Sequence, residues 1–527
     1  MPGLMQPWPL TLDRFLEHAG RWHGSTEVVS RSNEGPVTRC GYADIHRRAR
    51  QLSRALLEHG IALEDRVATL AFNSARHLEA WYGIMGIGAV CHTLNPRLPV
   101  GQLAYIVNHA ADRVLLADVL CAPIVRELSS HCPGIERVVL FADEAQLPAG
   151  VAATAYESWI AGRSTDCPWG GFSEETAAGL CYTSGTTGDP KGVLYSHRSN
   201  FLHGLCSLMP DVLGFSRRDV VLAIVPMFHA NAWGLAFAAP AVGAKFVLPG
   251  AKLDGASLFE LMETEGVTFS AGVPTVWQGL LQFLEREQLR PTTLKRIVSG
   301  GAAAPEALIR AYQEKYGIEV RHGWGMTEMS PIGTVNAPPD LATPTTEQGR
   351  AIFGVDLRLT DDEGAEVPQD GSTPGHLNVR GAAVARAYFR READGILDAG
   401  GWFDTGDIAT IDGSGMLRIT DRAKDVIKSG GEWISSIDIE NAAAAHPKAA
   451  LAAVVGMPHP KWGERPLLIV QLKVGQSSTA QEFLDFLEGR IARWWMPEAV
   501  QFVASIPLGA TGKIDKKQLR AALTRPA

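Results

Sequence analysis

The sequence predicts an α/β protein with a large N-terminal domain of layered α/β sheets, a β-rich subdomain within it, and a small α+β C-terminal domain. Three observations predict this fold class. Strand-like and helix-like segments alternate up to about residue 350, short strands separated by Asp/Gly turns follow, and a charged junction then precedes a stretch of mixed α and β pattern. A chain of 527 residues is also too long for one simple core, so two or three domains are expected.

The alternation begins with a helix predicted over Ile45 to His59, where apolar residues recur at helical spacing and Gly60 follows as a C-cap. A buried strand is predicted next, over residues 66–72. The same rhythm of helices and strands continues at about 75–85, 89–94, 219–225, 244–248, 267–273 and 295–299. Such βαβ repetition favours largely parallel sheets covered by helices.

After about residue 350 the pattern changes to short strands joined by turns. The turns are indicated by Asp and Gly at 361–364, 370–371 and 412–415, which predicts a β-rich subdomain over about 350–421. The charged junction Asp421–Asp425 marks the predicted boundary between an N-terminal domain, 1–421, and a C-terminal domain, 422–527. An amphipathic helix is expected in the second domain near 480–493.

Charge and cysteine content exclude several classes of protein. Lys+Arg 49 against Asp+Glu 57 gives a net charge of -8, which argues against a nucleic-acid partner. The seven cysteines are scattered without a CxxC, so neither a disulfide framework nor a zinc site is expected, and a reducing cytoplasm is the default location. We expect no signal peptide, because the N-terminus has no basic start and no long apolar run. We expect no stable membrane insertion, because the most apolar stretch, 232–250, is interrupted by Pro240 and Lys245.

The strongest local signal for chemistry is the segment Tyr182–Gly192, which follows a strand-like run. Its hydroxyls, glycines and lysine suit a polyphosphate, because glycine allows close backbone approach while N–H, hydroxyl and ammonium groups donate to anionic oxygens. It is not a Walker A loop, since Lys191 is followed by Gly192 rather than by Ser or Thr. A Gly/Thr-rich surface turn is the alternative, which the density of such residues disfavours.

The segment resembles the phosphate loop of the adenylate-forming superfamily, which contains acyl-CoA synthetases, firefly-type luciferases and peptide-synthetase adenylation domains. Further motifs of that family follow in its order, at Pro226–Gly234, Ser299–Pro305, Gly323–Glu328, Thr405–Asp407, Asp421–Asp425 and Pro507–Lys513. The resemblance covers essentially the whole chain. It implies that a carboxylic acid reacts with ATP to give an acyl-adenylate and pyrophosphate, and that the acyl group passes to coenzyme A with release of AMP. The implied cofactors are ATP, Mg²⁺ and coenzyme A.

The resemblance also implies which residues bind the nucleotide. They are Thr183, Ser184, Gly185, Thr186, Thr187, Gly188, Lys191, Gly301, Ala302, Ala303, Gly323, Trp324, Gly325, Met326, Thr327, Asp407 and Arg422. Trp324 stands where the family usually has tyrosine, and either ring can stack on adenine, although core packing is the alternative. Asp407 resembles the acid that accepts both ribose hydroxyls, and Arg422 should reach the ribose or a phosphate.

Glu328 and Thr183 resemble the ligands of Mg²⁺. A carboxylate beside a triphosphate would be repelled unless it bound a cation, and Mg²⁺ prefers oxygen and takes few protein ligands. A surface glutamate is the alternative for Glu328.

Lys513 resembles the catalytic lysine of the family. Carboxylate and triphosphate are both anions, so an ammonium that touches both offsets their repulsion in the transition state. The alternative is a solvated tail lysine, the class expected of the neighbouring Lys516 and Lys517.

The resemblance implies that the C-terminal domain is mobile and that Lys424 is its hinge. Rotation after adenylation would remove the catalytic lysine and bring in a second face that carries Lys428 and Glu432, for which catalytic roles are expected. The thiol of coenzyme A is the nucleophile in that step, so no protein cysteine is required.

The implied acyl pocket contains His229, Trp233 and Val273. His229 would orient the carboxylate or pack against the acyl group, and a satisfied core histidine is the alternative. Trp233 resembles an aromatic gate of fatty acyl-CoA synthetases. Trp277 either lines the same cavity or is a buried structural tryptophan.

Within the superfamily the motifs most resemble medium- and long-chain fatty acyl-CoA ligases and 3-methylmercaptopropionate-CoA ligases. The residues that carry this resemblance are His229–Trp233, Trp324–Pro331 and Lys428–Ser436. These groups share their motifs, so chain length stays open. The expected acid is a short- to medium-chain fatty acid or 3-methylthiopropionate. Long-chain and aryl acids are alternatives, and a non-catalytic nucleotide-binding protein is a different class.

Three other activities are less expected. A peptide-synthetase module would have a carrier domain downstream, and a luciferase would need an oxygenation pocket of which the sequence gives no sign. A fatty acyl-AMP ligase typically has an insertion near the hinge, whereas the segment Asp407 to Asp421 is short. Related enzymes are often homodimers, so a homodimer is expected.

Overall fold

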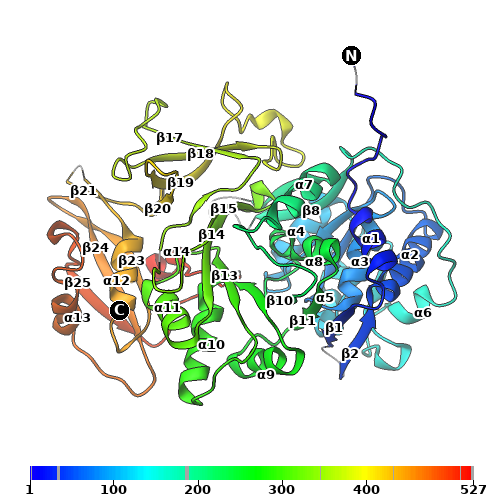
Figure 1. Ribbon diagram of the computed structural model, residues 1–527, viewed down its shortest axis with the longest axis horizontal. Coiled ribbons are helices and arrows are strands. Elements are labelled where there is room, and N and C mark those ends of the chain that lie inside the picture. Colours follow the sequence, from blue (N-terminus) through cyan, green and yellow to red (C-terminus); the bar gives the residue numbers. More distant parts are fainter. Residues whose placement is uncertain are drawn as a thin grey trace.

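Layered sheets and helices form the N-terminal part of the computed structural model, and a separate small domain follows (Figure 1). The structure describes residues 1, 3–32, 36–183, 189–344, 346–430, 432–510 and 512–523. The predicted α/β fold class is confirmed, because mostly parallel sheets are followed by an antiparallel sheet and then by a mixed α+β unit.

In the first large sheet, the strand before the phosphate loop is the neighbour of an edge strand. Its order is β7 (Thr154–Ala155), β6 (Arg137–Leu140), β5 (Val114–Ala117), β3 (Arg66–Leu70), β4 (Val90–Thr93), β8 (Ala177–Thr183) and β9 (Lys191–Ser196). All neighbouring pairs are parallel except β8 and β9, which are antiparallel. The predicted strands at 66–72 and 89–94 are therefore confirmed as central members of this sheet.

The second large sheet carries the other predicted parallel strands. Its order is β16 (Arg350–Ala351), β15 (Ile332–Asn336), β14 (Glu319–Gly325), β13 (Arg296–Gly300), β12 (Phe269–Gly272), β10 (Val220–Ala223), β11 (Lys245–Leu248), β1 (Glu27–Arg31) and β2 (Val37–Gly41). The strands from β14 to β1 are parallel, and antiparallel strands lie at both edges.

Helices cover both faces of these sheets. They are α1 (Asp13–Trp22), α2 (Tyr42–Glu58), α3 (Ala75–Met85), α4 (Val100–Ala110), α5 (Ala122–His131), α6 (Tyr156–Ile160), α7 (His197–Ser207), α8 (Leu235–Val242), α9 (Gly255–Glu265), α10 (Pro274–Arg286) and α11 (Glu306–Arg310). The largest apolar cluster joins α1, α2, α3 and α8 to strands of both sheets, so these helices form the layer between them. The predicted C-cap is confirmed, because Gly60 has φ +89° two residues after α2.

The predicted β-rich region forms an antiparallel sheet that lies above the second large sheet in Figure 1. Its strands are β17 (Val355–Thr360), β18 (Gly375–Gly381), β19 (Phe403–Ile411) and β20 (Leu417–Arg422). The predicted turn at 412–415 joins the last two strands, and the carboxylate of Asp412 accepts hydrogen bonds from the amides of Ser414 and Met416. Asx-type bonds of this kind fix the register of a hairpin.

The last unit packs helices on a mixed sheet. Its strands are β21 (Ile427–Ser429), β22 (Glu432–Ile434), β23 (Ala449–His459), β24 (Gly463–Leu472) and β25 (Ala499–Val503), and its helices are α12 (Ser436–Ala444), α13 (Ala480–Leu487) and α14 (Lys516–Leu523). The predicted helix over 480–493 is wrong in its second half. Helix α13 ends at Leu487 because Glu488 is extended, with ψ 127°, and Gly489 has φ +77°.

In the described part of the chain, no helix is long and apolar enough to cross a membrane. The cysteines are free, and most are buried.

Candidate active site

A cavity of about 1600 Å³ lies where the two large sheets, the β-rich sheet and the C-terminal unit meet. Residues at or just after the carboxyl ends of β4, β8, β12, β13 and β14 line it. Open α/β sheets bind ligands at the carboxyl ends of their parallel strands. The cavity is therefore in the position where this architecture offers a site.

Most of the predicted nucleotide-site residues line this one cavity. They are Thr183, Lys191, Gly301, Ala302, Ala303, Gly323, Trp324, Gly325, Met326, Thr327, Asp407 and Arg422. Thr183 and Lys191 are direct partners in the antiparallel pairing of β8 and β9, so they bracket the phosphate loop. The other predicted loop residues, Ser184, Gly185, Thr186, Thr187 and Gly188, lie outside the described residues.

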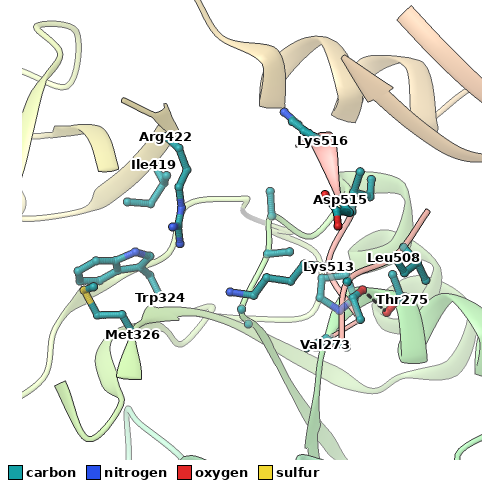
Figure 2. Close-up of a pocket in the computed structure, with 18 of the residues that line it drawn as sticks. Val273, Thr275, Trp324, Met326, Ile419, Arg422, Leu508, Lys513, Asp515 and Lys516 are labelled. Carbon is teal, nitrogen blue, oxygen red and sulfur yellow. Dashed lines mark hydrogen bonds between the residues drawn. The ribbon is translucent and has the colours of Figure 1, made fainter. Parts of the chain in front are cut away.

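Lys513 extends into the middle of the cavity from the C-terminal unit (Figure 2). Its loop is fixed to the N-terminal domain, because Thr275 donates through Oγ1 to the carbonyl of Gly512 at 3.1 Å and Arg97 donates to the carbonyl of Ala510 at 3.4 Å. Burial and, to a smaller extent, the charge of Arg422 lower the pKa of Lys513 to about 8. The structure thus brings the tail lysine to the same cavity as Thr183 and Lys191.

Lys513 approaches the backbone of Gly301 closely. A Cβ placed on Gly301 would lie 3.5 Å from Cε of Lys513 and 3.7 Å from Cζ2 of Trp233. Gly301 also has φ +79°, a conformation that favours glycine. The lysine and the tryptophan therefore both lie against the backbone at Gly301.

Asp407 is buried on β19, with 4% of its surface exposed. The indole Nε1 of Trp324 donates to its Oδ2 at 2.8 Å, and Nε of Arg422 lies 3.1 Å from its Oδ1. The pairing of β19 with β20 places Arg422 directly opposite Asp407. The three predicted residues are thus one connected group.

Glu328 is buried in a short 3₁₀ turn, with 6% of its surface exposed. Burial raises the pKa of its carboxyl group, whereas a 2.8 Å hydrogen bond from the hydroxyl of Tyr388 opposes that rise. Lys191 Nζ lies 4.8 Å from the centre of the Tyr388 ring. Tyr388 therefore connects the lysine of the phosphate loop to the predicted metal ligand.

The chemistry of this corner fits Mg²⁺. Glu328 and Thr183 both line the cavity and offer oxygen ligands, and no cluster of three or more His, Cys, Asp or Glu side chains that could hold a metal occurs among the residues described. Mg²⁺ is typically held by one or two protein ligands together with phosphate oxygens.

The predicted acyl-site residues His229, Trp233 and Val273 also line the cavity. Burial, together with the charges of Lys513 and Arg97, lowers the pKa of His229 to about 4, so this imidazole is neutral at pH 7. Residues 230–233 all have a left-handed backbone conformation, from Ala230 with φ +43° to Trp233 with φ +52°. This conformation costs roughly 1–2 kcal/mol per residue, so the packing of the surrounding side chains must stabilise it.

Trp277, for which two roles were open, is a structural tryptophan. It is fully buried, and its Nε1 donates to the carbonyls of Gly272 and Val298. These bonds join α10 to β12 and β13.

The charged junction, where the hinge is predicted, is bonded to two helices of the C-terminal unit. Oδ2 of Asp421 accepts the amide of Ser436 at 2.7 Å, and Oδ1 of Asp425 accepts from Arg520 at 2.8 Å. Lys424 lies between them and lines the cavity, and burial lowers its pKa.

Lys428, which is a predicted catalytic residue, lies outside the cavity in this structure. It is exposed on β21, does not line the cavity, and its Nζ lies 5.9 Å from the centre of the Trp433 ring. The side chain of Glu432 is outside the described part of the structure. In this orientation of the domains Lys513, rather than the hairpin of Lys428, enters the cavity.

The expectation that Lys516 is a solvated tail lysine is wrong. Its side chain is 13% exposed, its Nζ donates to Oγ of Ser436 at 2.5 Å, and it forms an ion pair of 2.8 Å with Glu440. The sequence missed this because Glu440 is on another helix. Lys517 is exposed, as predicted.

Sequence reasoning also missed Tyr388, Arg97 and Thr275. Each lies outside the recognised motifs and contacts a motif residue only in the folded chain. The one available signal was proximity in sequence, since Thr275 is two residues after the predicted pocket residue Val273.

Two family models match the chain. The model described as AMP-binding enzyme matches residues 15–389, and the model described as AMP-binding enzyme C-terminal domain matches residues 438–513. Together they cover both units that contribute to the cavity.

Relatives of established name match along nearly the full length. A 3-methylmercaptopropionyl-CoA ligase of Ruegeria lacuscaerulensis is 47% identical over 531 residues, covering 99% of this chain and 98% of that protein. A medium-chain-fatty-acid–CoA ligase of Ectopseudomonas oleovorans is 46% identical, covering 99% and 97%. The crystal structure of an anthranilate CoA ligase in complex with anthranoyl-AMP superposes with a TM-score of 0.89 at 27% identity, covering 98% and 99%.

Proposed function

The chain belongs to the AMP-binding enzyme family, and from that premise we propose that it joins an aliphatic carboxylic acid to coenzyme A through an acyl-adenylate. It is an AMP-forming acid–CoA ligase that consumes ATP. One observation carries the proposed assignment of roles: Lys513, Glu328 and Asp407 come from three different parts of the chain and line one cavity.

In the first half-reaction a carboxylate oxygen of the acid attacks the α-phosphorus of ATP. An O–P bond forms, the bond from the α-phosphorus to the bridging oxygen breaks, and pyrophosphate leaves. Both reactants are anionic, so the ammonium of Lys513 beside Gly301 offsets their repulsion. Asp407 binds the ribose, and Arg422 adds positive charge near the phosphates.

Glu328 and Thr183 hold Mg²⁺ in this proposal. When bound, the ion supplies positive charge to the phosphate oxygens as pyrophosphate departs. The hydrogen bond from Tyr388 favours the ionised carboxylate of Glu328 and so opposes the burial that raises its pKa.

In the second half-reaction the sulfur of coenzyme A attacks the acyl carbonyl carbon. A C–S bond forms, the C–O bond to AMP breaks, and the thiol proton is released. Lys513 occupies the cavity in this structure, so we infer that the C-terminal unit rotates about Lys424 before this step. The rotation would replace Lys513 by the hairpin that carries Lys428 and Glu432.

The lining near Trp233 favours an acid with an apolar chain. Apolar residues that line the cavity and belong to the same packed cluster as Trp233 are Ala230, Val273, Val298, Met326, Ile332 and Val335. A hydrocarbon or thioether chain loses no hydrogen bonds against such a surface, whereas a second charge would be desolvated without a partner. A short- to medium-chain fatty acid or 3-methylthiopropionate is therefore the proposed substrate.

A panel of straight-chain acids from C3 to C16, 3-methylthiopropionate and several aromatic acids tests the proposal. Pyrophosphate release and thioester formation are measured with and without coenzyme A. We expect turnover of short to medium aliphatic acids, and Lys513→Ala should lower pyrophosphate release by about 100-fold or more. The matched control is Lys461→Ala, an exposed lysine of the C-terminal unit that does not line the cavity.

A preference for benzoates would overturn the choice of acid and leave the reaction class intact. Unchanged pyrophosphate release in Lys513→Ala would overturn the role given to the tail lysine.

A further inference from the structure

The carboxylate of Asp407 is held at both oxygens by side chains from two different elements. Trp324, at the end of β14, donates its indole N–H to Oδ2 at 2.8 Å, and Arg422, on β20, lies 3.1 Å from Oδ1. Figure 2 shows the Trp324 ring and the Arg422 guanidinium on the side of the cavity that faces Lys513. The carboxylate is buried, so these contacts are formed with little competition from water.

We propose that Trp324 is a positioning residue that acts through Asp407: its indole N–H fixes the carboxylate so that both oxygens accept ribose hydroxyls, and it thereby makes the enzyme selective for ribonucleotides. The inference rests on the proposed function, because it assumes that the bound nucleotide is ATP.

The number of acceptor positions on the carboxylate of Asp407 supports this role. An ionised carboxylate has about four lone-pair positions, two on each oxygen. Trp324 and Arg422 each occupy one position on a different oxygen. One position on each oxygen therefore remains, which matches the two adjacent hydroxyls of a ribose.

Without the indole N–H the carboxylate would lose this arrangement. Arg422 presents several donors in a planar fork and can take both oxygens of a carboxylate at once. Asp407 would then turn toward Arg422, and fewer positions would face the ribose. The hydrogen bond from Trp324 keeps Oδ2 of Asp407 from pairing with Arg422.

The plane of the tryptophan ring is fixed by packing. A Cβ on Gly333 would lie 2.9 Å from Cζ3 of Trp324, so the benzene edge of the indole lies directly on that glycine. The ring also packs against the core of the β-rich sheet. The N–H is consequently directed at Asp407 by contacts on the opposite edge of the ring. A tyrosine carries its donor at the far end of the ring axis, so it is not equivalent here.

The test compares ATP with 2′-deoxyATP and 3′-deoxyATP in the wild type, Trp324→Phe and Trp324→Tyr. The values of kcat and KM are measured for pyrophosphate release, together with equilibrium binding of each nucleotide. Trp324→Phe keeps an aromatic face and removes the N–H. We expect its KM for ATP to rise about 10-fold, as for the loss of one hydrogen bond to a charged group, with kcat within about threefold. The deoxynucleotides should be affected much less, so the preference for ribose should fall.

A sharper variant replaces Trp324 by β-(3-benzothienyl)alanine, which has the same shape and stacking surface with sulfur in place of N–H. We expect the same loss of ribose preference with an unchanged melting temperature. The matched control is the same replacement at Trp22, which is 64% exposed and distant from the cavity lining. Asp407→Asn should remove the difference between tryptophan and the thiophene analogue, because the two residues act as a unit.

An equal loss of affinity for all three nucleotides would show that Trp324 acts by stacking or packing alone, and it would overturn the inference while leaving the proposed function intact. Absence of ATP binding to the wild type would overturn both.

Discussion

The hydroxyl of Tyr388 donates a 2.8 Å hydrogen bond to Oε1 of Glu328. The bond crosses from the segment after the β-rich strand β18 to the turn after β14. It favours the ionised carboxylate in a place where burial favours the neutral acid.

Removal of this hydroxyl should therefore weaken the binding of Mg²⁺, and the effect should be larger at low pH. In Tyr388→Phe the pKa of Glu328 rises further, so a larger fraction of the carboxyl group is protonated at pH 6 than at pH 8. We expect the Mg²⁺ concentration for half-maximal pyrophosphate release to increase several-fold at pH 6 and less at pH 8. Tyr316→Phe, at a buried tyrosine outside the cavity lining, is the control. Identical Mg²⁺ titrations at both pH values would exclude this role of Tyr388.

The lowered pKa of Lys513 predicts how adenylation depends on pH. The lysine acts as a cation, and its folded pKa of about 8 means that the charge is lost as pH rises through that value. We expect kcat/KM for pyrophosphate release to fall above about pH 8, since this parameter reports the free enzyme. Lys513→Arg should remove this descending limb, because guanidinium stays protonated, even if the overall rate is lower. If the fall in kcat/KM above about pH 8 persists unchanged in Lys513→Arg, another group causes it.

Trp233 should limit the length of the acyl chain. Its ring edge would lie 3.2 Å from a Cβ on Gly300, so the ring fills the space beside the backbone where the acid is expected. Trp233→Ala should raise kcat/KM for C12 relative to C6 by about 10-fold or more, because each added methylene that gains contact contributes about 1–3 kcal/mol. The measurement is the full C3–C16 series with both proteins. An unchanged chain-length profile would mean that the acyl chain takes another path.

The buried pair of Lys516 and Glu440 should matter for stability rather than for chemistry. Its two side chains are 13% and 16% exposed, and Lys516 also donates to Ser436 at the start of α12. Lys516→Met leaves the carboxylate of Glu440 without its partner, which should cost about 3 kcal/mol in the unfolding of the C-terminal unit. Calorimetry or urea unfolding would measure the loss. Lys517→Ala should change it by less than about 0.5 kcal/mol, as is usual for exposed positions.

Much of this protein was determined by its sequence alone. Hydrophobic periodicity placed several buried strands in each large sheet, and glycine with Asp/Gly turns placed the end of one helix and a hairpin, because these features depend on a few adjacent residues. The motifs also indicated the chemistry, since a phosphate loop, an acidic turn and a glycine-flanked tail lysine are local patterns. The predicted helix at 480–493 was too long, because helical spacing continues past Glu488, where the backbone leaves the helix.

Only the tertiary structure decided which donors and acceptors meet. Tyr388 and Glu328 are 60 residues apart, Trp324 and Asp407 are 83 apart, and Lys516 is 80 residues from Ser436. Such contacts are set by sheet order and by the packing of one unit on another, which no short window of sequence encodes. In the sequence alone these side chains are ordinary surface or core residues, and their roles arise when folding buries them beside distant partners.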